Sequence, residues 1–267
     1  MAGKRLIVYH KIIITLMPVC VALICFLSCG DTKVVRNIAT ADSLTEVNQQ
    51  EAVRYIDSVA RADKGMSRND RMKLQLLRMK ALNKTDCPLD TDTLASLVKY
   101  FDRHGTANDR MLANYILGCY YICKGNPPEA MRYLHLAADA ADTTDAGCDW
   151  RTLHKIHVHT AQQLMYQNAL MDAMDENALA LKYAMAAKDT FNAIITLEQC
   201  SNIYLNQGIV DKAFDIRSKL YGMYMRHGYA KEAAISLGPL IRILAERGNL
   251  AESKRCLDIY SMKKKAD

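Results

Sequence analysis

Residues 117–137 read LGCYYICKGNPPEAMRYLHLA and predict two helices joined by a tight turn. Gly125 suits the position just past a helix end, because glycine readily adopts the left-handed conformation found there. Asn126 precedes two prolines and Glu129, and proline in the first turn with an acid near the positive end of the helix dipole is typical of a helix start. The stretch therefore predicts a helical hairpin.

Similar start and end signals recur along the chain. Thr106 with Asp109 can form a capping box at a helix start, and so can Ser67 with Asp70. These signals predict an opening helical piece at 40–62 and hairpins at 66–104, 107–141, 150–188, 190–227 and 231–263. The hairpin at 150–188 fits least well, and we expect its turn near 174–176, where glycine is missing.

The composition agrees with a helical chain. Half of the 267 residues are hydrophobic, and the 12 glycines and 5 prolines are fewer than a turn-rich sandwich or barrel usually needs. The formal net charge of +6 falls to +3 when Lys4, Arg5 and Lys11 are set aside. This charge is too weak to indicate nucleic-acid binding, which asks for a dense basic stripe.

The N-terminus has the organisation of an export signal. Basic residues precede an apolar run at 12–27 whose one polar member is Thr15. A membrane-spanning helix needs about 20 apolar residues, so this run is short for one. Phe26-Leu27-Ser28-Cys29 resembles a bacterial lipobox, with Phe26 where leucine is usual.

The lipobox resemblance implies cleavage after Ser28 and a lipid on Cys29. We then expect a signal peptide at 1–28, a lipidated linker at 29–39 and a helical domain at 40–267, and the alternative is an uncleaved anchor. Two acyl chains hold a protein stably at a membrane. The expected location is the cell membrane or outer membrane of a Gram-negative bacterium, facing the periplasm or the surface.

Six cysteines follow Cys29 and contain no CxxC pair. Export makes disulfides possible, but a buried cysteine acting as a small apolar residue is the simpler interpretation. Whether these cysteines pair is left open.

The hairpins resemble tetratricopeptide repeats. The resemblance rests on Leu117-Gly118-x-x-Tyr121 followed by Gly125, Ala130, Leu134 and Ala137, on a second copy with Tyr204, Gly208 and Ala213, and on a third with Leu244, Gly248 and Leu257. It implies an all-α fold, in which antiparallel helical hairpins stack into a right-handed superhelix, an α-solenoid.

The order of features is also similar to a group of tetratricopeptide lipoproteins of Bacteroidota. The similarity rests on Ser28-Cys29-Gly30, Ala41-Asp42-Ser43-Leu44, Asp92-Thr93-Leu94 and the stretch from Tyr100 to Gly105. It likens this chain to the N-terminal sensor half of envelope-anchored regulators. Many of those continue into a transmembrane helix and an output domain, and this sequence shows neither after its helical part.

The repeat resemblance also implies a partner-binding groove lined by the first helix of each hairpin. Carried over onto this sequence, the groove residues are Leu112, Tyr115, Cys119, Ile122, Glu198, Asn202, Leu205 and Arg242. Some members clamp a peptide carboxylate with a cation one turn before an asparagine. Here Glu198 takes that place before Asn202 and would repel a carboxylate.

We find no catalytic motif and expect no cofactor and no metal. His154, His157 and His159 form H-x-x-H-x-H, in which the first two can share a helix face and the third points away. Exposed or helix-packing side chains are the favoured interpretation of these histidines. The predicted function is a non-catalytic envelope scaffold that binds a protein or peptide. The alternatives are an accessory ligand- or glycan-binding lipoprotein, or a sensor subunit without an output domain.

Overall fold

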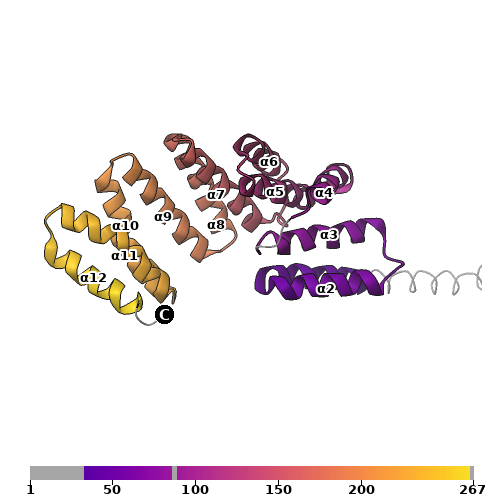
Figure 1. The fold of residues 1–267 in the computed structure, drawn as a ribbon, viewed down its shortest axis with the longest axis horizontal. Coiled ribbons are helices and arrows are strands. Elements are labelled where there is room, and N and C mark those ends of the chain that lie inside the picture. The colour runs from indigo at the N-terminus through magenta and orange to yellow at the C-terminus, as the bar shows by residue number, and fades with distance from the viewer. Residues whose placement is uncertain (1–32, 86–88, 265–267) are drawn as a thin grey trace, which may run out of the picture. The chain divides into compact units, whose positions relative to one another are not determined.

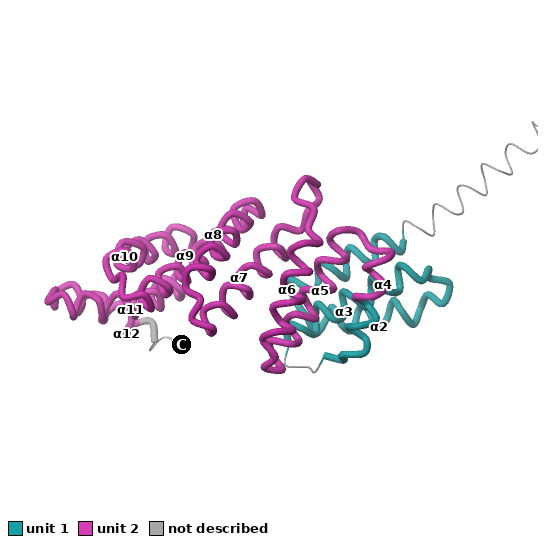
Figure 2. The backbone as a smooth tube through the Cα atoms, turned by 90° about the horizontal axis from the view of Figure 1, so that it is seen from above, with its two compact units in different colours: residues 1–97 teal, residues 98–267 magenta. Residues whose placement is uncertain are grey.

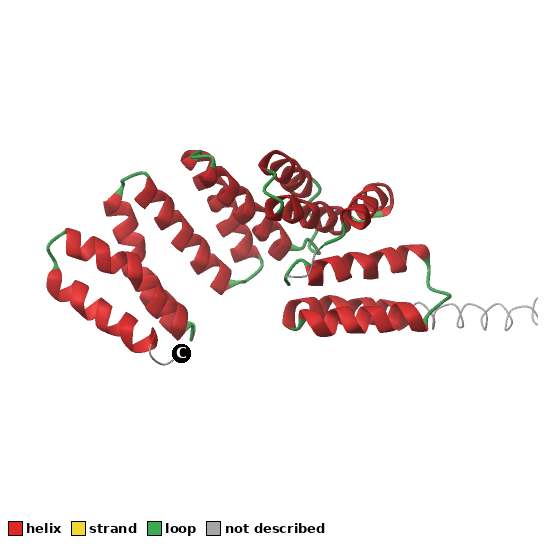
Figure 3. Cartoon of the chain, in the orientation of Figure 1, coloured by secondary structure: helices red, strands yellow, loops and turns green. Residues whose placement is uncertain are grey.

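The computed structural model describes residues 33–85 and 89–264, and every regular element in these two ranges is a helix (Figure 3). The chain divides into two compact units, one ending at Leu97 and the other beginning at Val98 (Figure 2). The boundary falls inside α4 (Thr91–His104). Cys29 lies outside the described residues. No helix in the described ranges combines the length and apolar composition needed to cross a bilayer.

The first unit contains a helix over 33–47, then α2 (Gln49–Ala62) and α3 (Arg68–Leu82). Asn48 separates the first two helices, and its side chain accepts a hydrogen bond from the Glu51 N–H as the N-cap of α2. One sequence expectation needs correction here, because residues 33–39, expected to be a linker, are helical. The predicted helical piece at 40–62 comprises the end of this helix together with α2.

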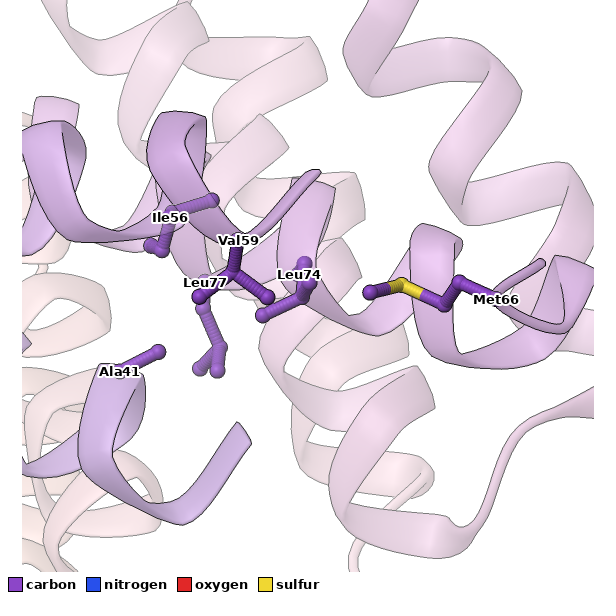
Figure 4. Close-up of a cluster of buried hydrophobic side chains, with 6 residues drawn as sticks. All are labelled: Ala41, Ile56, Val59, Met66, Leu74 and Leu77. Atoms are coloured by element: carbon purple, nitrogen blue, oxygen red, sulfur yellow. The ribbon is translucent and has the colours of Figure 1, made fainter. Parts of the chain in front are cut away.

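A small apolar core holds this first unit together. Its buried members come from all three helices and from the α2–α3 connection, and they are Ala41, Ile56, Val59, Met66, Leu74 and Leu77 (Figure 4). Apolar side chains removed from water contribute the main stabilisation of such a bundle.

The second unit contains α5 to α12 (Figure 1). Their bounds are α5 (Ala107–Cys123), α6 (Pro127–Asp139), α7 (Trp150–Tyr166), α8 (Leu170–Ala186), α9 (Thr190–Asn206), α10 (Val210–Arg226), α11 (Ala230–Glu246) and α12 (Leu250–Lys264). Each hairpin from α5 to α12 packs its two helices together, and each second helix up to α10 also packs against the next first helix. The expected capping box at Thr106 and Asp109 is present at the start of α5.

The turns inside these hairpins share one backbone feature, a residue with positive φ. Gly125, Gly208 and Gly248 have φ of 64°, 72° and 75°, and Asn168 has φ of 60° in the third hairpin. The turn of that hairpin therefore lies at 167–169, and the prediction of 174–176 was wrong. Asparagine tolerates the left-handed conformation better than most residues with a side chain, so it takes the place of glycine here.

The correction reveals a regular repeat. α7, α9 and α11 each have 17 residues and begin 40 residues apart, at Trp150, Thr190 and Ala230. α5 also has 17 residues but precedes α7 by 43, because a longer connection at 140–149 follows α6. Side chains at the same place in each first helix are therefore structurally equivalent.

Gly118 lies where the paired helices α5 and α6 come into close contact. A Cβ atom added there would lie 3.2 Å from Leu134 Cγ on α6. Ala130 and Leu134 are fully buried. A glycine at this place lets α5 and α6 approach closely enough to bury Leu134 between them.

Candidate functional site

The thirteenth residues of the four first helices form a row that we call the first-helix row. It consists of Cys119 on α5, Gln162 on α7, Asn202 on α9 and Arg242 on α11. Three of them were predicted to face a partner. Gln162 was missed, although the 40-residue spacing from Asn202 would have identified it once the turn at Asn168 was recognised.

Accessibility increases along the first-helix row. Cys119 is 5% exposed, and Tyr115, one turn before it, is 7% exposed. These two predicted groove residues lie beneath the surface, because α5 packs against both α6 and α7. Gln162 and Asn202 are half-buried, and Arg242 is exposed. The polar side chains of the row are therefore at least partly accessible to solvent from α7 onward.

The remaining predicted groove residues flank the first-helix row. Leu112, Ile122, Glu198 and Leu205 are all half-buried. Leu112 is the sixth residue of α5, and Ile122 and Leu205 are the sixteenth residues of α5 and α9. Their assignment to a binding face remains a prediction.

Arg217 of α10 lies at the centre of a buried polar network and is only 1% exposed. Its Nε donates to Ser201 Oγ and its Nη1 to Glu198 Oε1, both on α9 and both at 2.8 Å. Its Nη2 donates to Asn202 Oδ1 at 2.5 Å, and Nη1 also reaches the Ser236 carbonyl oxygen on α11 at 3.5 Å. The guanidinium thus connects α10 with α9 and α11, and it binds two of the predicted groove residues, Glu198 and Asn202, from the buried side.

The contacts with Arg217 change the charge that Glu198 presents and the orientation of the Asn202 amide. The carboxylate of Glu198 was expected to repel an anionic partner, but the charge of Arg217 now lies 2.8 Å away and compensates it. Arginine has only donors, so Asn202 must turn Oδ1 toward it. Nδ2 of the same amide is not engaged by Arg217.

Tyr224 of α10 completes the network. Its hydroxyl donates to Glu198 Oε2 at 3.0 Å, so both carboxylate oxygens of Glu198 have partners. Burial, together with the negative charge of Glu198, raises the pKa of the Tyr224 phenol well above its usual value. The raised pKa favours the neutral phenol, which is the form that donates to Glu198.

Sequence reasoning gave no indication of Arg217. It lies four residues after Ala213, where the α5–α6 hairpin has Leu134 four residues after Ala130. An apolar residue is expected there, and Leu134 is fully buried. The signal in the sequence that could have identified Arg217 is a charged residue at a repeat position where an apolar residue is expected.

The three histidines of α7 pack against neighbouring helices. His154 Nδ1 lies 3.0 Å from the Ala180 carbonyl oxygen, and His157 Nδ1 lies 2.6 Å from Glu176 Oε2, so the two share a helix face, as predicted, and this face packs against α8. His159 instead contacts the Tyr115 ring on α5. Burial lowers the pKa of both His154 and His159. Within residues 33–85 and 89–264, no three His, Cys, Asp or Glu side chains are grouped to hold a metal ion.

The cysteines of the described ranges are free thiols. Cys119, Cys148, Cys200 and Cys256 are buried, as the simpler interpretation of the sequence expected, whereas Cys123 is exposed. Cys87 lies outside the described residues. Burial raises the pKa of Cys200, which makes its thiolate scarce near neutral pH.

Comparisons with known proteins give structural matches alone. No protein-family model matches the chain, and no curated protein matches it. BtubC (BKLC) from P. vanneervenii is 13% identical, with 87% of this chain and 91% of that protein covered and a TM-score of 0.63. The apo form of RapI is 12% identical, with 85% of this chain and 64% of that one covered and a TM-score of 0.70.

A signal transduction ATPase with numerous domains (STAND) from Pyrococcus horikoshii, which has a tetratricopeptide repeat sensor, is 15% identical. The match covers 88% of this chain and 36% of that one, with a TM-score of 0.62. This chain spans less than two thirds of the length of the ATPase and of RapI. At such low identities the matches show the fold alone. The chain is an all-α helical-repeat protein with a tetratricopeptide-like fold.

Proposed function

We propose that this protein is a non-catalytic scaffold, tethered to a membrane through Cys29, that binds an extended protein or peptide segment along the first-helix row. The observation that carries the proposal is the network in which Arg217 compensates Glu198 and orients Asn202. A buried arginine that connects three helices makes the exposed side of this network rigid. Rigid donors bind a ligand at lower entropic cost than mobile ones.

The chemistry of the first-helix row suits the carbonyl groups of a peptide. Gln162, Asn202 and Arg242 supply hydrogen-bond donors from three consecutive hairpins. Glu198 is compensated by Arg217, and Arg242 lies 3.8 Å from the Glu246 carboxylate, so this face carries little net charge. A segment of low net charge, whose backbone carbonyls meet the donors, fits this face better than a strongly acidic segment.

The membrane tether is proposed from the sequence. The apolar run at 12–27, the small residues around it and Cys29 resemble a lipoprotein signal. A Cys29→Ala variant should then fail to incorporate radiolabelled palmitate in the native host. Incorporation equal to that of the unchanged protein would refute the lipidation site.

Site-specific photo-cross-linking tests the binding face. A photoreactive amino acid at Gln162, Leu205 or Arg242 should capture the same envelope protein, whereas one at Lys219 or Lys254, exposed on second helices, should not. Asn202→Ala should reduce the yield from Gln162 and leave the helical circular dichroism unchanged. Equal capture from both sets of positions would refute a partner at the first-helix row.

The two alternative functions are a sensor subunit without an output domain and a glycan-binding lipoprotein. A sensor subunit that acts through a separate partner gains support from the STAND protein, whose tetratricopeptide repeats are its sensor. The identity of the cross-linked protein distinguishes this alternative from a scaffold. Glycan binding usually relies on exposed tryptophan faces, and Trp150, the single tryptophan, is half-buried and stacks on Tyr183 with ring centroids 5.9 Å apart.

A further inference from the structure

Two of the second helices carry a polar residue at a repeat position that is buried. The eighth residue of α6 is Leu134, that of α8 is Asn177 and that of α10 is Arg217, and each is at most 1% exposed. α8 and α10 both have 17 residues, and they begin 40 residues apart, at Leu170 and Val210. Asn177 is therefore the structural equivalent of Arg217 in the layer formed by α7, α8 and α9.

Asn177 differs from Arg217 in its hydrogen bonds. Arg217 donates to three side chains of α9, whereas neither Oδ1 nor Nδ2 of Asn177 has a hydrogen-bond partner among the described residues. Asn177 is 0% exposed, so bulk solvent does not reach its amide. A buried carboxamide without hydrogen bonds destabilises a folded chain, and leucine, which α6 has at this position, would avoid that cost. Asn177 thus points to a polar group that binds here from outside the chain.

The repeat identifies the part of α7 that faces Asn177. The residues 40 positions before the three α9 partners of Arg217 are Val158, Ala161 and Gln162. Val158 replaces Glu198, so this position has no acid to compensate a cationic ligand. The acid next to Asn177 on α8, Glu176, already binds His157 at 2.6 Å. A neutral polar group therefore suits this layer better than a guanidinium or an ammonium group.

A second amide without a partner faces the same layer. Gln199 Oε1 on α9 is buried and accepts no hydrogen bond from any residue that the structure describes. Gln199 is the tenth residue of α9, and His159, the tenth residue of α7, contacts Tyr115, the ninth residue of α5. By this equivalence Gln199 is directed toward Val158, the ninth residue of α7. Since α8 packs against both α7 and α9 (Figure 1), the amides of Asn177 and Gln199 belong to one layer.

We propose that Asn177 and Gln199 bind the carboxamide of a glutamine in the partner segment, a proposal that rests on the first-helix row as the binding face. The two acceptors Asn177 Oδ1 and Gln199 Oε1 and the donor Asn177 Nδ2 lack partners in the described chain. A primary carboxamide has two N–H groups and one carbonyl oxygen, so it matches all three. Gln162 is the half-buried row residue of this layer, and its side chain turns aside when the glutamine enters.

This chemistry selects glutamine over side chains of similar size. A glutamate carboxylate has acceptors alone, so the two acceptors of the site would remain unpaired. A leucine side chain would leave both amides unpaired. A site that hydrogen-bonds a ligand group discriminates strongly against analogues without it, because its own buried polar groups then lack partners.

Peptide binding to the full chain in detergent micelles tests the glutamine site. The probes are nonapeptides of alternating alanine and serine with glutamine, glutamate or leucine in the middle. Each has a fluorophore at its N-terminus and an N-methylamide at its C-terminus, so the glutamine supplies the single primary carboxamide. Fluorescence anisotropy should show at least about tenfold tighter binding of the glutamine peptide than of the other two.

Substitutions of Asn177 locate the preference. Asn177→Leu should bring the three peptides to equal affinity, and Asn177→Ala should do the same without adding volume to the core. Asn206→Leu makes the same change at an exposed position of α9 and should keep the preference. Circular dichroism verifies that each variant is folded. Equal binding of the three peptides to the unchanged chain, binding of none of them, or a preference that survives in a folded Asn177 variant would overturn the inference.

The glutamine site and the proposed function fail in distinguishable ways. Photo-cross-linking from the first-helix row, combined with equal affinity for the three peptides, would retain the protein-binding function and overturn the glutamine site. Preference for the glutamine peptide without any cross-linked partner would retain the glutamine site and refute the protein-binding function.

Discussion

Replacing Arg217 with leucine tests the central network of the second unit. Leucine is the residue that the α5–α6 hairpin has at the same repeat position, so the substitution preserves helix propensity and apolar packing. The polar partners of Arg217 lose their donor. Ser201 is fully buried and has no access to water, whereas Glu198 is 26% exposed and can be partly hydrated.

The expected cost follows from these exposures. Leaving a buried hydroxyl unsatisfied costs about 1 kcal/mol or more, and removing one partner of a buried ion pair costs about 3–5 kcal/mol. The partial exposure of Glu198 brings the expected total to the low end, about 3 kcal/mol. For a chain of this size, that lowers the melting temperature by about 6–12 °C.

Thermal unfolding followed by circular dichroism measures the effect, and a second substitution isolates its cause. Arg217→Leu combined with Glu198→Gln removes the uncompensated carboxylate, so the double variant should recover about 1 kcal/mol relative to Arg217→Leu alone. The reasoning is refuted if Arg217→Leu unfolds within about 0.5 kcal/mol of the unchanged protein, or if Glu198→Gln adds its full cost to the first substitution.

Three further predictions concern single positions. Burial lowers the pKa of His159 in the folded state. The stability that its neutral form provides is therefore fully present above the unfolded pKa of about 6.5, and it is lost as the pH falls below that value. The melting temperature should decline over this pH range, and His159→Phe should flatten the decline, whereas His135→Gln, at an exposed position, should not. Lys188 has φ of 55°, so Lys188→Gly should raise the stability by up to about 1 kcal/mol in urea unfolding, and a loss would contradict the assigned backbone conformation. Gly118→Val should cost about 1–3 kcal/mol in the same assay, because its Cβ would lie 3.2 Å from Leu134, and a stable variant would show that α5 and α6 can separate freely.

The helical hairpins were predictable because their signals are local. Caps such as Thr106 with Asp109, and glycines such as Gly208 just past a helix, act within a few residues of the chain. The turn at Asn168 was missed for a related reason. Asparagine is common in helices, loops and turns alike, so the residue type alone does not reveal a left-handed backbone. Gly208 and Gly248 are 40 residues apart in the sequence, and the observed positive φ of Asn168 extends this spacing to the third hairpin.

The sequence by itself determined the all-α fold class, the hairpins from α5 to α12 and the shared helix face of His154 and His157, because helix periodicity and caps depend on neighbours along the chain. Tertiary structure decided which charges meet. Arg217 compensates Glu198 only because α10 packs on α9, and Lys80 meets Asp42 only because α3 packs beside the helix over 33–47. Electrostatic interactions depend on distance in space, and residues 19 to 38 positions apart become neighbours only when the helices pack.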